Sequence, residues 1–239
     1  MSTSFASRLA SPLRQFGWKE GFLYLLAMGL ARLSAGKIQL IRYHFVAQPV
    51  PATTQDRPLP QGARTSIDFI TPADAVVAQF PRPKTIIARR FANGDRCIAS
   101  RTDERFTGYI WFARGHYDED TVRCRYTLAN PSQSVWDYDV FVHPDFRMGR
   151  TFARLWSTAN RHLAEEGVRW SYSRIATANP QSLDSHRRLG IEALFSASFL
   201  KVGTLQLMIA STAPYVHLSL SATSIPELRL LPPQRAGDT

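Results

Sequence analysis

The stretch VHPDFRMGRTFARLW, from Val142 to Trp156, changes character halfway along its length. It begins with the β-branched and aromatic residues of a strand end and finishes with the apolar spacing of an amphipathic helix. Phe152, Leu155 and Trp156 start that apolar series, and Gly167 is placed to end the helix. The sequence therefore predicts a strand that turns almost directly into a helix.

The join between strand and helix carries two basic residues, Arg147 and Arg150. A helix N-terminus offers unpaired backbone N–H groups and the positive end of the helix dipole, which together favour an anion. Guanidinium groups at this point add charge where a diphosphate would lie. The same residues also suit an ordinary helix start with solvated arginines, so this segment alone leaves both interpretations open.

Outward from this join, the chain alternates short strands and helices. Runs of β-branched and aromatic residues predict strands at 37–47, 65–70, 96–101, 106–115, 121–128, 136–142, 168–177, 192–203 and 205–211. Apolar spacing and capping residues predict helices at about 5–15, 18–34, 71–80, 149–166 and 179–190. Thr71 is the expected N-cap of the 71–80 helix, and no regular element is expected after Pro214.

This order predicts an α/β protein of the α+β type. We expect a mixed, mostly antiparallel central sheet of about seven strands flanked by helices. The Pro-rich segment 48–63 lacks the N–H donors of a regular ladder and is typical of a linker. The chain is therefore expected to divide into an N-terminal extension and linker (1–63), a main domain (64–213) and a C-terminal tail (214–239).

The chain of 239 residues has a hydrophobic content of 44%, which is typical of a globular protein. Its 29 Lys and Arg residues exceed its 19 Asp and Glu residues by 10, which favours an anionic partner. Nucleic acid is not favoured, because no recognition motif is present and the arginines are scattered. The two cysteines, Cys97 and Cys124, form no framework of disulfides or metal ligands, and we expect a cytoplasmic protein.

The N-terminal region contains an apolar stretch, Phe22–Leu33, that is too short to span a membrane. Pro12 and Trp18 interrupt the pattern of a secretory signal. We expect a helix packed on the domain. The alternative is a peripheral contact of residues 1–37 with the inner membrane face, supported by the basic residues of this segment.

Two motifs together resemble the GNAT superfamily of acyl-CoA N-acyltransferases. The segment VFVHPDFRMGRTFARL keeps the family's hydrophobic strand, Pro144, Arg147 and Leu155, but carries Arg150 and Phe152 where the signature has small residues. The segment ANPQSLDSHRRLGIEALFSASFLKVG is similar to the family's closing motif, in which an Asn follows a strand and a short helix leads through a basic residue and a Gly into another strand. The resemblance covers roughly residues 66–211, and it implies a GNAT-like fold.

The resemblance implies acetyl-CoA or another acyl-CoA as co-substrate, an acceptor amine on a small molecule or a macromolecule, and no metal. Phe141 and Val142 would pair with the pantetheine arm through their backbones, and Asn179 would contact it from the opposite side. The pyrophosphate would be held by the N–H groups of the turn, at Arg147, Met148, Gly149, Arg150, Thr151 and Phe152.

The expected chemistry needs a proton for the leaving thiolate and a base for the amine. Many relatives have a Tyr four residues before the closing Gly, and that position here is His186, with Ser185 beside it as a second candidate. Asp139 is the candidate base, against a structural salt bridge to Arg123 or Arg125. Strand alternation predicts that Asp139 shares one face with the side chains of residues 137, 141 and 143.

The histidines show no spacing typical of metal ligands, so no metal site is predicted. The alternative to an enzyme is a non-catalytic GNAT-like module that binds an anionic partner or a membrane surface. A further alternative is aminoacyl transfer from a charged tRNA on the same fold. The sequence alone does not determine the oligomeric state.

Overall fold

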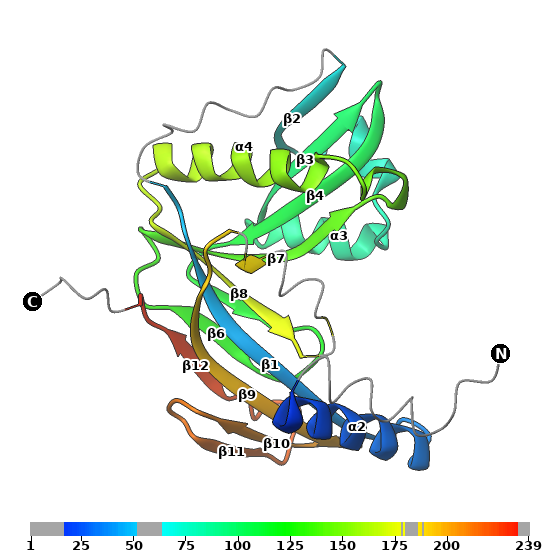
Figure 1. The fold of residues 1–239 in the computed structure, drawn as a ribbon, viewed down its shortest axis with the longest axis vertical. Coiled ribbons are helices and arrows are strands. Elements are labelled where there is room, and N and C mark those ends of the chain that lie inside the picture. Colours follow the sequence, from blue (N-terminus) through cyan, green and yellow to red (C-terminus); the bar gives the residue numbers. More distant parts are fainter. Residues whose placement is uncertain (1–16, 52–63, 178, 180–185, 188, 234–239) are drawn as a thin grey trace, which may run out of the picture. The chain divides into compact units, whose positions relative to one another are not determined.

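The computed structural model describes residues 17–51, 64–177, 179, 186–187 and 189–233 (Figure 1). Its contacts divide the chain into two compact units. The first unit takes its described residues from 1–48, 118–127 and 174–239, and the second takes them from 49–117 and 128–173. Each unit therefore draws on segments that are far apart in the sequence. The predicted boundaries at 63 and 213 stay a prediction.

The second unit is built on strands that run in the order β2-β3-β4-β7-β8. Their bounds are β2 Thr65–Ile70, β3 Arg96–Thr102, β4 Arg105–Ala113, β7 Ser134–Val142 and β8 Trp170–Ala176, whose last three residues belong to the first unit. The β2–β3, β3–β4 and β4–β7 pairs are antiparallel, whereas β7 and β8 are parallel. This arrangement is mixed and mostly antiparallel, as the sequence predicted.

The helices of this unit cover both faces of the strands. Their bounds are α3 Lys84–Ala92, α4 Thr151–Glu165 and the short 3-10 helices η1 Ala75–Gln79 and η2 Pro144–Phe146. Trp156 of α4 packs against Phe112, whereas Arg90 of α3 lies over Trp111, the preceding residue of β4. Because neighbouring residues of a strand point to opposite faces, α3 and α4 lie on opposite faces of β4.

Helix α4 is the element that the sequence predicted best. Leu155, Trp156, Ala159 and Leu163 are all buried, at the three- and four-residue intervals of one helix face. The helix contacts β2, β3 and β4 through this face (Figure 1). Burial of such a face supplies most of the stability of a helix of this length.

A β-bulge interrupts β7 next to α3. Tyr109 of β4 is paired with Phe141 and Trp111 with Tyr138, so two residue steps on β4 match three on β7. The extra residue lies at Asp139, whose φ of 47° is in the left-handed region. The sequence predicted that the side chains of residues 137, 139, 141 and 143 share one face of β7. This prediction is wrong, because the extra residue of the bulge interrupts the two-residue repeat of the strand.

The first unit has its own antiparallel strands, in the order β11-β10-β9-β1. Their bounds are β1 Ile38–Pro49, β9 Glu192–Val202, β10 Leu205–Ala210 and β11 Val216–Ser219. The unit also contains helix α2 Trp18–Leu33, and β12 Glu227–Leu230 beside β6 Arg125–Leu128; the short strand β5 spans His116–Asp118. Strand β1 pairs with β9 along most of its length, so this part of the predicted N-terminal extension is an integral sheet strand.

Several predicted elements differ from the structure. The described residues form the twelve strands β1 to β12 where nine were predicted, and the tail after Pro214 contributes β11 and β12. The predicted helix at 71–80 is a turn followed by η1, because the Asp74 carboxylate accepts hydrogen bonds from both the backbone N–H and the hydroxyl of Thr71. Helix α3 was not predicted. The predicted helix at 5–15 and most of the helix at 179–190 lie outside the described residues.

Both cysteines are buried free thiols, as expected for packing residues. Burial raises the pKa of Cys97 and of Cys124, which makes them poor nucleophiles. Within the ranges that the structure describes, no helix combines the length and the apolar character needed to cross a bilayer.

Candidate functional site

The predicted strand-to-helix join exists as a short turn between β7 and α4. Strand β7 ends at Val142, η2 follows directly, and α4 begins at Thr151. The N-cap residue of α4, Arg150, makes no capping hydrogen bond through its side chain, and the first helical turn contains no acidic residue. Neither the Arg150 side chain nor an acidic side chain of the first turn therefore offsets the positive end of the helix dipole, which favours an anion.

Some of the predicted amide donors are already used by the turn. The N–H of Arg147 donates to the Pro144 carbonyl at 3.3 Å, and that of Gly149 donates to the Phe146 carbonyl at 3.2 Å. The Arg154 N–H makes the 2.9 Å bond to Arg150 that starts the helical ladder. The donor best placed for an anion is consequently the N–H of the predicted Thr151, in the first turn of α4.

The bulky residues of the turn are directed in ways that leave the helix start accessible. The Met148 side chain is fully exposed, and the Phe152 ring packs edge-on against Trp156, one turn along α4, with 6.5 Å between ring centroids. Arg147 donates through its Nε to the Val142 carbonyl at 3.2 Å. Arg150 is exposed. The side chains of Arg150 and Phe152, which stand where the signature has small residues, therefore do not prevent an anion from binding at this helix start.

Asp139 lies in a buried ion-pair cluster on the α3 side of β7. Its carboxylate accepts hydrogen bonds from Arg82 at 2.5 and 3.0 Å, from Arg90 at 2.6 Å and from the Tyr109 hydroxyl at 3.1 Å. The side chains of Asp139 and Arg90 are only 9% and 8% exposed. Burial alone would raise the pKa of Asp139, but the hydrogen bonds from Arg82 and Arg90 outweigh it and hold the pKa below 3.8.

This geometry answers one question about Asp139 that the sequence left open. The salt-bridge partners are Arg82 and Arg90 rather than Arg123 or Arg125. A carboxylate held by two guanidinium groups has little affinity for a proton, which disfavours Asp139 as a general base. The cluster instead fixes the bulge in β7, because it ties the strained residue to α3.

The other predicted site residues belong to the first unit. His186 is buried, and its carbonyl accepts a hydrogen bond from Leu189 at 2.9 Å. Asn179 is exposed and donates through its backbone N–H to Ala176 at the end of β8, at 2.8 Å. Ser185 lies outside the described residues. The described residues contain no cluster of three or more potential metal ligands.

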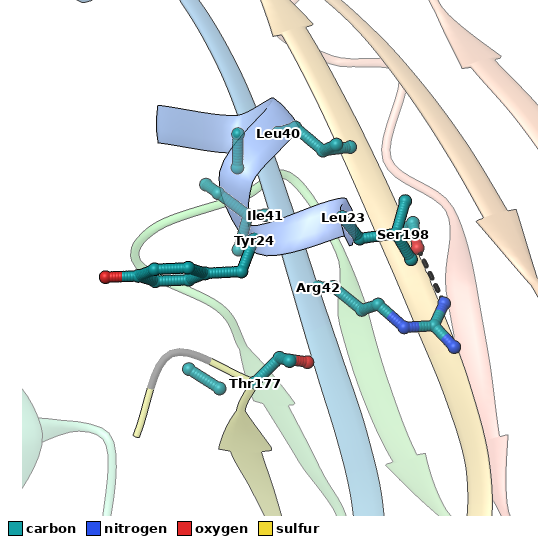
Figure 2. A pocket seen from close by; sticks show the side chains of 9 residues that line it. Leu23, Tyr24, Leu40, Ile41, Arg42, Thr177 and Ser198 are labelled. Atoms are coloured by element: carbon teal, nitrogen blue, oxygen red, sulfur yellow. Dashed lines mark hydrogen bonds between the residues drawn. The ribbon is translucent and has the colours of Figure 1, made fainter. Parts of the chain in front are cut away.

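The structure also brings together polar residues that the sequence analysis did not connect. Arg42 of β1 donates through Nε to Glu20 of α2 at 2.9 Å and through Nη1 to Ser198 of β9 at 2.9 Å. The Thr177 hydroxyl lies 3.2 Å from His44 Nε2 and 3.4 Å from the Glu20 carboxylate. We call these five residues the Arg42 cluster. Figure 2 shows Arg42 extending from β1 to Ser198, with α2 lying over the strand.

An apolar cavity of about 150 Å³ adjoins the Arg42 cluster. Its apolar walls come from α2, β1 and the end of β8, through Leu23, Tyr24, Ala27, Leu40, Ile41 and Ala176. In the sequence, this cavity and its polar cluster are indicated only by Leu40, Arg42 and His44, which occupy every second position of β1 and so share one face of the strand. Glu20 and Thr177 are 157 positions apart, so their meeting could not be predicted from spacing.

His44 makes the Arg42 cluster sensitive to pH. Burial lowers the pKa of His44 below 6.5, and Arg42 and Arg187 lower it further, while Glu20 opposes them. Because the folded pKa is the lower one, the unfolded chain binds the proton more readily, and stability is lost as the pH falls below about 6.5. We expect the melting temperature to decline from pH 7 to pH 5, above the range in which carboxylates titrate.

The matched variants for this prediction are His44→Gln and His116→Gln, the latter at an exposed histidine of β5. Thermal unfolding followed by circular dichroism between pH 8 and pH 5 should show a flatter decline for His44→Gln only. An unchanged pH dependence in His44→Gln would contradict a neutral, buried role for this imidazole.

Comparisons with known proteins give distant similarities only. No protein-family model and no curated protein matches the chain. The chain is similar to a solved structure of a conserved protein of unknown function from Staphylococcus epidermidis, with 10% identity and a TM-score of 0.46 over 72% of this chain and 66% of that one. It is similar to a protein from Novosphingobium aromaticivorans assigned to the GNAT family of acetyltransferases, with 14% identity and a TM-score of 0.46 over 67% and 63%.

A third similar structure is a tandem GNAT protein from the clavulanic acid biosynthesis pathway, with 17% identity and a TM-score of 0.46 over 68% of this chain and 54% of that one. The chain thus spans between about half and two thirds of the length of these three proteins. The roles proposed below rest on the residues of this chain.

Proposed function

We propose that the protein transfers an acyl group, in the simplest case acetyl, from acyl-CoA to an amine on a small molecule or macromolecule. The observation that carries this proposal is the start of α4, which has no side-chain N-cap, lies one short turn after β7 and follows Arg147 and Arg150. Such a helix start attracts a phosphate group through its backbone donors and its dipole. The excess of 10 positive charges also favours an anionic co-substrate.

Strand β7 supports the same proposal through its second edge. Its ladder with β8 covers Ser134 to Trp136 in the described residues, although β7 continues to Val142. The backbone of a strand beyond its ladder can add an extended chain, as in recognition by strand addition. We propose that Phe141 and Val142 pair with the amides of the pantetheine arm, which would leave the pyrophosphate near Thr151 and Phe152.

The reaction that we propose has simple requirements. The amine nitrogen attacks the thioester carbonyl and forms a carbon–nitrogen bond, the carbon–sulfur bond breaks, the nitrogen gives up a proton to water, and the leaving thiolate takes up a proton. We propose His186 as the donor of that proton, with Ser185 as the alternative, and Asn179 as a contact to the pantetheine arm. The pairing of Asp139 with Arg82 and Arg90 favours a positioning role at the bulge instead of proton transfer.

Titration calorimetry with acetyl-CoA and with plain CoA tests this proposal. We expect dissociation constants in the micromolar range, weakened at least about tenfold in Arg147→Glu, since the variant removes one charge-assisted contact to phosphate and adds a repulsive charge. Arg169→Glu makes the same charge change just beyond the other end of α4, and we expect no more than about a twofold effect. Equal loss in both variants would point to nonspecific attraction.

The second candidate is a non-catalytic module that rests on a membrane surface. Helix α2 supports it, because large apolar side chains are exposed along its length, at Trp18, Phe22, Leu26, Met28 and Leu33. Flat titrations with both CoA compounds, together with sedimentation of the protein with anionic liposomes, would favour this candidate. For either candidate we propose a cytoplasmic location, since free buried thiols suit a reducing compartment.

A further inference from the structure

The cavity beside the Arg42 cluster has the size of a small organic group. Its volume is about 150 Å³, and an apolar cavity of that volume in another protein holds a benzene molecule. A group of about six carbon atoms therefore fits. The apolar walls from α2 and β1 would surround it on two sides, with Leu23 and Leu40 facing the space in Figure 2.

In the described part of the chain, Arg42 is the one charged residue that lines this cavity. The Arg42 guanidinium is paired with the Glu20 carboxylate at 2.9 Å, and both side chains are about one-quarter exposed. His44 adds no charge near pH 7, since burial lowers its pKa. A charged ligand group would lose its hydration here without meeting an unbalanced counter-charge, which disfavours carboxylates and ammonium groups alike.

The polar groups on the cavity wall nevertheless offer hydrogen bonds. Arg42 and Ser198 line the space, and a guanidinium or a hydroxyl can donate to a carbonyl oxygen, whereas the Thr177 hydroxyl already donates to Glu20. A neutral amide, ester or thioester carbonyl matches these donors without adding charge. The cavity thus combines an apolar space for about six carbons with donors suited to one uncharged carbonyl group.

We propose that this cavity binds an alkyl or aromatic group of about six carbons joined to a neutral carbonyl. The geometry of the cavity alone supports its role as a ligand site. The further assignment of the cavity to a substrate of acyl transfer rests on the function proposed above. In that setting it would select an acyl group longer than acetyl, or an acceptor with an apolar part of this length.

Ligand-detected NMR titration with hexanamide, acetamide and hexanoate tests the cavity without any CoA compound. Hexanamide has both the apolar chain and the neutral carbonyl group. Acetamide lacks the apolar chain, and hexanoate has a charged carboxylate in place of the neutral carbonyl group. We expect hexanamide to bind in the millimolar range and at least about tenfold more tightly than either of the other two. Equal binding of hexanoate and hexanamide would overturn the neutral-carbonyl part of the proposal.

Two alanines of α2 provide a matched pair of variants. Ala27 lines the cavity, whereas Ala31, one turn further along the same helix, does not. Ala27→Leu should fill the space and weaken hexanamide binding at least tenfold, and Ala31→Leu should leave it within about twofold. Ser198→Ala, which removes only the hydroxyl, should weaken hexanamide more than it weakens hexanol. Undiminished hexanamide binding in Ala27→Leu would overturn the site.

The outcomes separate this inference from the proposed function. Loss of hexanamide binding in Ala27→Leu with unchanged binding of plain CoA supports the cavity as a distinct ligand site. If the protein binds hexanamide but no CoA compound, the result supports the cavity as a ligand site and contradicts the proposed acyl transfer. If the protein binds CoA but not hexanamide, the result contradicts the cavity as a ligand site and leaves the proposed acyl transfer in place.

Discussion

Replacing Asp139 by asparagine is expected to lower the free energy of unfolding by about 3–5 kcal/mol, because it leaves a buried cation without its counter-charge. Arg90 is only 8% exposed and makes its 2.6 Å hydrogen bond to this carboxylate. Arg82 and Tyr109 lose the same partner. Urea denaturation followed by tryptophan fluorescence measures the change.

The control for this prediction is Asp145→Asn, at an exposed carboxylate that pairs with Arg105 at 3.5 Å. An ion pair of this kind contributes about 0–1 kcal/mol, so the control should unfold almost as the parent protein does. An Asp139→Asn protein of undiminished stability that has lost turnover would contradict the structural role and restore the interpretation of Asp139 as a base.

Replacing Gly108 by alanine is expected to destabilise the protein by about 1–3 kcal/mol through overpacking. A Cβ atom at this position would lie 2.6 Å from the Phe141 carbonyl oxygen and 3.1 Å from Leu155 Cδ1. The first of these contacts is with backbone, so β7 itself would have to move. Because Phe141 lies at the proposed pantetheine edge, we also expect weaker CoA binding in calorimetry.

Gly149→Ala is the matched control for Gly108→Ala. A Cβ at Gly149 would meet only the Phe146 carbonyl oxygen, at an ordinary contact distance of 3.4 Å. The residue is exposed and does not adopt a positive φ, so alanine should be neutral or slightly stabilising. Equal thermal stability of Gly108→Ala and the parent protein would mean that β4 and β7 are less closely packed than the structure indicates.

The sequence predicted those parts of the fold that depend on local periodicity. The apolar positions of α4 from Leu155 to Leu163 follow a helical period that burial confirms. Strands β4 and β7 could be predicted for a similar reason, because most of their side chains are apolar or aromatic. The mixed, mostly antiparallel architecture follows from the order of these elements.

The features that were missed depend on contacts between distant segments. The bulge at Asp139 breaks a two-residue period that strand prediction assumes, and its partner Arg90 lies in α3, 49 residues away. The Arg42 cluster likewise joins α2, β1, β9 and the end of β8, which are far apart in the sequence. At residues 71–80, a local hydrogen bond from Thr71 to Asp74 replaced the expected helix cap.

The central claim is that the start of α4 holds the pyrophosphate of acyl-CoA. Amide hydrogen exchange of peptides that cover residues 147–152, with and without acetyl-CoA, measures this most directly. We expect slower exchange in these peptides at saturating acetyl-CoA, and unchanged exchange at the far end of α4 near Gly167. Binding of acetyl-CoA that leaves exchange at 147–152 unchanged would contradict it.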